Sequence, residues 1–483
     1  MTNNPSLKST ATRGMLWNAL EKFSVQAGQL IIGIILARIL MPEDFGLIGM
    51  LSIFIAISQT FIDSGMGSGL IQKKNRTEID FSTVFVFNFA VSATFYLILY
   101  ITAPLIADFY NMPQLVDLTR VLAIIIIINS LAIVQRSRLT INIDFKTIAK
   151  VNVVSVFTSG AFGILFAYMG YGVWALVIQQ LINALVAVIM FWFLSRWKPS
   201  FLFSKQAFKD LFGYGSKLLL SGLYAQTMAN IYNIAIGKAF SAAELGFYTR
   251  AKSFAELTAG TVTSVLHQVS FPILSSLQED RKRMVHIFSR MIRMSSFIIF
   301  PAMTMLAILA DPIVRLLLTE KWLPAVPLLQ LMCFARVFYP ISVINMNILN
   351  AIGRSDLFLK VDLSKFPISI VALIVTIPLG VEAMVIGHVV TSFISYIINS
   401  YMPGKLFGYG ALAQLRDMVP VLIATAITGA IVFVANSFVD NISLKLLFGA
   451  TIGLVVYLIT GNILKIEELN EVKLLIKNVL NRK

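Results

Sequence analysis

The chain of 483 residues is 57% hydrophobic and only 13% charged, whereas charged residues make up about a quarter of a typical soluble domain. Apolar runs of about 18 or more residues recur from Trp17 to Thr460, which excludes a soluble enzyme, a single-pass anchor and an outer-membrane barrel. The formal charge of +15 is attributed to cytoplasmic loops, so no nucleic-acid partner is expected.

Apolar length, Pro and Gly punctuation and charge clusters predict fourteen membrane-spanning helices. The first six lie near residues 15–40, 45–70, 82–107, 115–135, 148–169 and 172–194. The other eight lie near residues 212–239, 244–270, 286–310, 323–350, 358–378, 381–402, 416–436 and 442–463. The predicted fold class is therefore an all-α polytopic membrane protein.

Most of the 39 lysines and arginines fall in alternate loops, which the positive-inside rule places in the cytoplasm. Both termini are predicted on that side. The opposite loops are too short to hold an outer catalytic domain, and all five tryptophans lie near predicted span ends, as in an interfacial aromatic belt. In the second half, Arg290 and Arg293 are assigned to the inner interface.

An internal repeat divides the chain. The segment Ala37–Gly46 recurs in a related form as Gly237–Gly246, and Gly172–Ile178 matches Gly380–Ile386 at five of seven positions. Each repeat holds six helices, so the two halves share one orientation and are related by an axis along the membrane normal. The usual protein of this kind is a transporter with its site between the lobes; the alternative is a duplicated scaffold without transport.

The predicted regions follow from this repeat. They are an N-terminal six-helix lobe (1–195), a cytoplasmic connector (196–211), a C-terminal six-helix lobe (212–403), two additional transmembrane helices (404–463) and an amphipathic cytoplasmic tail (464–483).

Cations inside predicted spans are candidates for substrate binding, because an uncompensated charge in a bilayer costs several kcal/mol. Arg336 lies near the middle of the 323–350 helix, either as a cation lining a cavity or as the buried partner of a carboxylate. Arg250 and Lys252 open the 244–270 helix, as substrate contacts or as a local ion pair. Arg38 and Lys238 hold equivalent repeat positions, as a cationic rim or as snorkelling side chains.

Two carboxylates are candidates for binding a coupling proton or sodium ion. Asp63 is a lone acid at the end of the 45–70 helix, where a cap or ion pair is the alternative. Glu256 lies four residues after Lys252 and can pair with it on one helix face. Ser241 and Glu244 fit a capping box and are assigned a structural role.

Several catalytic motifs are absent from the sequence. The chain has no Walker A sequence and no His-Glu-x-x-His, and its single cysteine, Cys333, excludes a Cys-x-x-Cys pair. We therefore expect no catalytic residues, no metal, no bound cofactor and no ATP-driven pumping by this chain.

Four segments together resemble bacterial Wzx and WzxC-type polysaccharide flippases. They are Leu36–Leu47, Asp63–Gly65 followed by Leu70–Lys73, Gln268–Pro272, and Glu320–Trp322 with Pro327–Leu331. The resemblance covers essentially the whole chain. It places the protein in the multidrug, oligosaccharidyl-lipid and polysaccharide exporter superfamily, and implies a V-shaped, MATE-like fold of two six-helix lobes plus two helices.

The resemblance also implies a function. The protein would move an undecaprenyl-pyrophosphate-linked oligosaccharide from the inner to the outer leaflet of the bacterial cytoplasmic membrane, driven by an ion gradient or the membrane potential. Membrane lipids, a polysaccharide polymerase and a chain-length regulator are the expected partners of a monomer. The alternatives are a MATE-like drug/cation antiporter, a lipid II flippase, and a polysaccharide polymerase or ligase.

Overall fold

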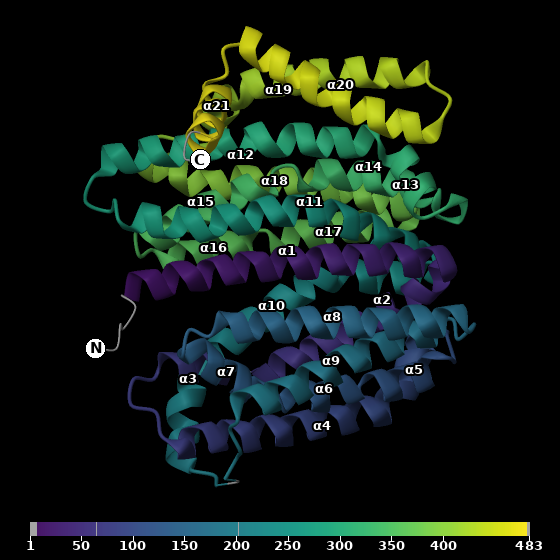
Figure 1. The fold of residues 1–483 in the computed structure, drawn as a ribbon, viewed down its shortest axis with the longest axis vertical. Coiled ribbons are helices and arrows are strands. Elements are labelled where there is room, and N and C mark those ends of the chain that lie inside the picture. The colour runs from purple at the N-terminus through teal and green to yellow at the C-terminus, as the bar shows by residue number, and fades with distance from the viewer. Residues whose placement is uncertain (1–6, 64, 201, 481–483) are drawn as a thin grey trace. The chain divides into compact units, whose positions relative to one another are not determined.

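The protein is described here by a computed structural model that covers residues 7–63, 65–200 and 202–480. Its described residues form helices without strands (Figure 1). The first ten helices are α1 (Leu7–Ile39), α2 (Pro42–Asp63), α3 (Met66–Gln72), α4 (Glu78–Tyr110), α5 (Leu115–Leu122), α6 (Ile124–Ser130), α7 (Ile133–Ile141), α8 (Phe145–Tyr168), α9 (Val173–Ser195) and α10 (Lys205–Ala239). The ends of the chain, which the sequence predicts to be cytoplasmic, lie outside the described residues.

The second half of the chain contains eleven α-helices and two short 3-10 helices within the described residues. They are α11 (Ala242–Ser275), α12 (Arg281–Ile308), α13 (Ala310–Leu317), η1 (Glu320–Trp322), α14 (Ala325–Arg336), α15 (Tyr339–Ala351), α16 (Ser355–Ser364), α17 (Phe366–Thr376), η2 (Ile377–Leu379), α18 (Val381–Phe407), α19 (Ala411–Ser437), α20 (Ile442–Ile463) and α21 (Glu467–Leu480).

Eleven segments of the described chain are long and apolar enough to cross a membrane. The all-α membrane fold is thereby confirmed, whereas the count of fourteen stays a prediction. The three predicted spans outside the eleven correspond to α10, α11 and the pair α16 and α17. Helices α10 and α11 are long but rich in polar residues, and a break at Lys365 separates α16 from α17.

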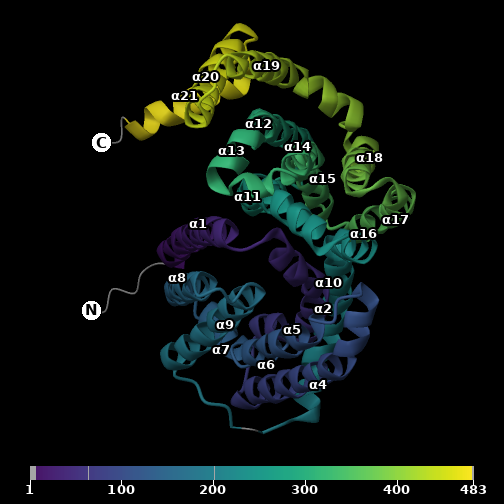
Figure 2. The ribbon, with the colours of Figure 1, turned by 90° about the vertical axis from the view of Figure 1, so that its right-hand side faces the viewer.

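Packing divides the chain into two units, Met1–Gly246 and Phe247–Lys483. This division falls after the 196–211 connector that the sequence predicts, because α10 packs on α2, α3 and α4 of the first unit. The predicted lobes rest on the sequence repeat rather than on packing, so their boundaries stay a prediction. In the first unit, α1 lies beside α8, as the two views agree (Figures 1 and 2).

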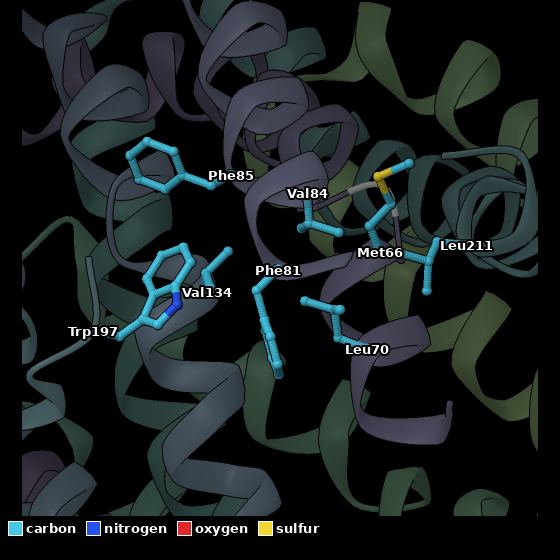
Figure 3. Packing of buried hydrophobic residues seen from close by; sticks show 8 residues of the cluster. All are labelled: Met66, Leu70, Phe81, Val84, Phe85, Val134, Trp197 and Leu211. Atoms are coloured by element: carbon cyan, nitrogen blue, oxygen red, sulfur yellow. The ribbon is translucent and has the colours of Figure 1, made fainter. Parts of the chain in front are cut away.

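One apolar core of the first unit includes two residues of the predicted connector, Trp197 and Leu211. The core consists of Met66, Leu70, Phe81, Val84, Phe85, Val134, Trp197 and Leu211 (Figure 3). The Trp197 ring packs edge-on against Phe81 and Phe85 at 6.3 and 6.0 Å between centroids. Its indole N–H donates to Glu78 at 2.7 Å. The connector is therefore fixed to the start of α4.

Helices α2 and α11 begin with the same hydrogen bond at positions that are equivalent in the repeat. The backbone N–H of Met41 donates to the Asp44 carboxylate, and that of Ser241 donates to Glu244, each at 2.9 Å. The Ser241 hydroxyl in turn accepts from the Glu244 N–H at 3.2 Å. The predicted capping box is thus confirmed.

Two glycines allow the first turns of α2 and α11 to touch backbone to backbone. A β-carbon at Gly46 would lie 1.8 Å from the carbonyl oxygen of Ala242. Reciprocally, a β-carbon at Gly246 would lie 1.9 Å from the carbonyl oxygen of Pro42. The sequence aligns Gly46 with Gly246, so the contact joins the same position of the two repeats. Neither position has room for a side chain.

The C-terminal helix α21 is held on the second unit by ion pairs with α12, and Figure 2 shows it beside α20. Arg293 donates to the buried Glu468 at 2.8 Å and also pairs with Glu467 and Asp417. The Tyr409 hydroxyl donates to Asp417 at 2.7 Å. Burial, together with this hydrogen bond, raises the pKa of Tyr409, so its phenol stays protonated. Arg293, assigned from sequence to the interface, therefore anchors the tail.

Replacing Arg293 by Met should lower the stability of the second unit by about 3 kcal/mol, because Glu468 would remain buried without its partner. Thermal unfolding of the purified protein in detergent and limited proteolysis before α21 measure this change. Arg290→Met is the matched control, since Arg290 and Glu471 form a more exposed pair worth about 1 kcal/mol or less. Equal effects of the two substitutions would contradict the anchoring role of Arg293.

Candidate functional site

The predicted 323–350 helix is broken next to its arginine. Helix α14 ends at Arg336 and α15 begins at Tyr339, whereas the sequence analysis treats this segment as one helix. Pro340 explains the break, because it has no N–H to donate to the carbonyl of Arg336 four residues earlier. Ser392 of α18 donates instead to the neighbouring Ala335 carbonyl. Val337 and Phe338 keep right-handed helical backbone angles, so α14 and α15 form one membrane-spanning segment with a proline kink.

Aromatic side chains pack around the break. The Phe338 ring stacks on Tyr396 of α18 at 4.8 Å between centroids and meets Phe300 of α12 edge-on at 5.7 Å. Tyr396 is fully buried, and its hydroxyl donates to the Ala411 carbonyl at 3.1 Å. The break is therefore held by α12 and α18 and gives Arg336 a defined position.

Arg336 forms an ion pair with Glu256 of α11. Its guanidinium also lies over the Tyr339 ring, 5.4 Å from the centroid, a distance that allows a cation–π contact. The Arg336 side chain is 17% exposed and the Glu256 side chain 45% exposed. Arg336 thus has a carboxylate partner, which is the more accessible of the two. A role for Arg336 as a cation lining a cavity stays a prediction.

Lys252 and His388 are both affected by the charge of Arg336. Lys252 lies one helical turn before Glu256 on α11, and the charges of Glu256 and Arg336 both act on it. The charges of Arg336 and Lys252 act in turn on His388 of α18. We call Arg336, Glu256 and Lys252 the charged cluster, and His388 lies next to it. These three are candidate site residues from the sequence, whereas His388 is not.

Arg250 lies on the same helix in a different environment. Its guanidinium is 6.0 Å from the centre of the Trp322 ring, which is fully buried in η1. Phe247 packs edge-on against Trp322 at 5.9 Å between centroids. Arg250 is thus a half-buried cation over an aromatic ring, and a role in substrate contact stays a prediction.

The candidate cations of the first unit are exposed. Arg38 lies in the last turn of α1. Lys238 donates to the Phe109 carbonyl at 2.6 Å and lies over the Phe109 ring at 4.9 Å. Lys238 therefore ties α10 to the end of α4. The cationic rim predicted from sequence is not tested by these contacts.

The carboxylate of Asp63 lies at the end of α2 and is exposed. Gln59 donates to it at 3.5 Å, and Asn129 of α6 donates to the Gln59 oxygen at 3.2 Å. The described residues contain no group of three or more His, Cys, Asp or Glu placed to hold a metal ion. The coupling role of Asp63 stays a prediction.

Replacing Pro340 by Ala should stabilise the α14–α15 segment by about 1 kcal/mol while slowing the protein's activity, because the restored N–H can close the helix across the break. Thermal unfolding and a transport assay measure the two effects together. Pro420→Ala, at a proline inside α19 and away from the charged cluster, is the matched control. Normal activity of Pro340→Ala would show that the break is dispensable.

Fold and site together define a multi-pass membrane protein with a broken helix that carries a charged cluster, as expected for a carrier of an ionic substrate. Residues 35–327 match the profile of a family described as polysaccharide biosynthesis proteins, and the chain belongs to this family. The family that the sequence resembles is thereby confirmed.

Individual relatives span nearly the whole chain. It is 26% identical to TuaB, a teichuronic acid biosynthesis protein of Bacillus subtilis (strain 168), over 91% of this chain and 92% of TuaB. It is 24% identical to ExoT, a succinoglycan biosynthesis transport protein of Rhizobium meliloti (strain 1021), over 93% and 92%. Among solved structures, the lipid II flippase MurJ in an inward closed conformation has a similar fold, with a TM-score of 0.76. The two sequences are 17% identical, and the match covers 93% of this chain and 98% of the MurJ chain.

Proposed function

We propose that the protein moves a polyprenyl-diphosphate-linked oligosaccharide repeat unit from the inner to the outer leaflet of the bacterial cytoplasmic membrane, for assembly of a surface polysaccharide. The observation that carries this proposal is the charged cluster beside the helix break, in a membrane chain of the polysaccharide biosynthesis family. TuaB and ExoT are both named as polysaccharide biosynthesis proteins, and ExoT also as a transport protein, which supports this proposal.

The substrate class explains why cations lie inside the membrane-spanning region. A diphosphate carries negative charge, and taking an uncompensated charge into a bilayer costs several kcal/mol. Arg336 can form paired hydrogen bonds to phosphate oxygens. Lys252 of α11, one helical turn before Glu256, adds a second positive charge. The polyprenyl chain can remain in lipid while the glycan and diphosphate cross beside the cluster.

The remaining assignments follow from this role. Translocation makes and breaks no covalent bond, so the protein acts as a carrier rather than an enzyme. We assign Arg250 to the same substrate path, with Arg38 and Lys238 at its outer rim. Asp63 and Glu256 are the candidates for binding the proton or sodium ion of a driving gradient. A polymerase and a chain-length regulator would act on the product, and the carrier would function as a monomer.

The test is translocation by the purified protein in proteoliposomes. The probe is the lipid-linked repeat unit extracted from the source organism, placed in one leaflet and detected in the other by a glycan-specific reagent that does not cross the membrane. We expect protein-dependent transfer of this probe. Absence of transfer from active, folded preparations would contradict the proposal, and equal transfer of lipid II would indicate a broader lipid-linked substrate class.

A further inference from the structure

The two partners of the Arg336–Glu256 pair differ in how firmly they are held. Arg336 is largely buried, lies over the Tyr339 ring and follows directly from the helix break. Glu256 is nearly half exposed and lies on α11, a separate helix. If the pair opens, the carboxylate can therefore move toward solvent, whereas the guanidinium stays in place.

Glu256 also has a second cation within reach. Lys252 precedes it by four residues on α11, the spacing at which side chains of opposite charge meet on one helix face. The charges of Glu256 and Arg336 both act on Lys252. A carboxylate that leaves Arg336 can thus pair with Lys252 without crossing to another helix.

A carboxylate and a phosphate offer an arginine the same arrangement of acceptor oxygens. Glu256 therefore occupies the position at Arg336 that an anionic headgroup would take. Without either anion, Arg336 would be a buried cation with no counter-charge, which is strongly unfavourable. A carrier changes conformation once with its substrate bound and once empty. Arg336 therefore needs an anion beside it in both states.

We propose that Glu256 is a displaceable counter-ion of Arg336, which leaves Asp63 as the candidate for the coupling ion. The substrate diphosphate takes its place on Arg336 during loading, and Glu256 moves to Lys252. After release in the outer leaflet, Glu256 pairs with Arg336 again, and this pairing allows the empty carrier to return. This inference rests on the proposed function, whose substrate supplies the competing anion.

Two transport modes can be measured in the same proteoliposomes, and loss of the counter-ion should affect them differently. Net transfer of the lipid-linked repeat unit requires the empty carrier to return. Exchange of labelled for unlabelled repeat units across the membrane requires only the loaded carrier. For Glu256→Gln we expect net transfer to fall about tenfold or more, with exchange within about twofold of the wild-type rate, because only the empty state loses its counter-ion.

Three further variants keep the test decisive. Glu256→Asp retains the carboxylate and should restore most of the net transfer. Glu382→Gln, at an exposed glutamate in the first turn of α18, is the matched control and should transport normally in both modes. The double variant Glu256→Gln/Arg336→Gln contains no uncompensated charge at the pair, so it should unfold at the wild-type temperature while losing both modes.

The outcomes distinguish this proposal from the proposed function. Wild-type net transfer by Glu256→Gln, or equal loss of net transfer and exchange in a variant that unfolds at the wild-type temperature, would overturn the counter-ion role and leave the carrier function intact. If the wild-type protein supports neither mode, the carrier function itself fails, and the counter-ion role fails with it.

Discussion

Replacing Gly246 by Val is expected to lower stability by about 3 kcal/mol or more and to abolish activity, because the new side chain would overlap a backbone carbonyl. The β-carbon would lie 1.9 Å from the Pro42 oxygen, and a backbone group cannot move aside as a flexible side chain can. Gly46→Val should behave in the same way, because its β-carbon would lie 1.8 Å from the Ala242 oxygen. Thermal unfolding in detergent measures both effects.

The matched control for these substitutions lies on the same helix as Gly246. At Gly260 of α11, an added β-carbon would meet nothing within 4 Å, so Gly260→Ala should be neutral or stabilising by up to about 1 kcal/mol. If Gly246→Val were as stable as Gly260→Ala, the close backbone contact between α2 and α11 would be wrong.

Replacing Arg336 by Ala is expected to reduce net transport of the lipid-linked repeat unit about 10- to 100-fold, which is the range for losing charge-assisted hydrogen bonds to a phosphate. Stability should change little, because Glu256 can still pair with Lys252, one helical turn before it on α11. Arg336→Lys keeps the charge but loses the paired geometry, so it should fall between alanine and wild type. Rates in proteoliposomes and melting temperatures check both parts.

The control for Arg336 is an arginine outside the membrane-spanning segments. Arg354 donates to Asp356 through two hydrogen bonds of 2.8 Å and lowers the pKa of that carboxyl to about 2. The pair therefore contributes above the usual aspartate pKa and is lost only as the pH falls toward 2. Arg354→Ala should leave transport near pH 7 unchanged. A similar loss in Arg354→Ala and Arg336→Ala would indicate a general charge effect.

The fold class and the family can be predicted from the sequence because both depend on patterns that extend over long segments of the chain. Apolar length predicts the spans, and the segment Leu36–Leu47 carries much of the resemblance. The same patterns predict two further spans but miss the interruptions within them. Both the 115–135 and 323–350 helices are interrupted, since apolar length alone does not register where backbone hydrogen bonds stop. Pro340 is the sequence signal that marks the second break.

Candidate site residues are harder to predict, because partners come from distant parts of the chain. Arg336 and Glu256 are 80 residues apart, and sequence spacing suggests only the local pair of Glu256 with Lys252. His388 lies in the field of Arg336 and Lys252, which both belong to other helices. Arg293 likewise finds Glu468, 175 residues away. Side-chain charge identifies such residues, but only the fold assigns their partners.

The most direct test of the account is a leaflet-resolved measurement in cells depleted of the protein. The lipid-linked repeat units are labelled from outside before and after permeabilisation, with wild type, Arg336→Ala or Arg250→Ala supplied in trans. We expect complete repeat units to accumulate in the inner leaflet on depletion, and we expect wild type to clear them while Arg336→Ala does not. Repeat units that reach the outer leaflet normally without the protein would contradict its role as the carrier.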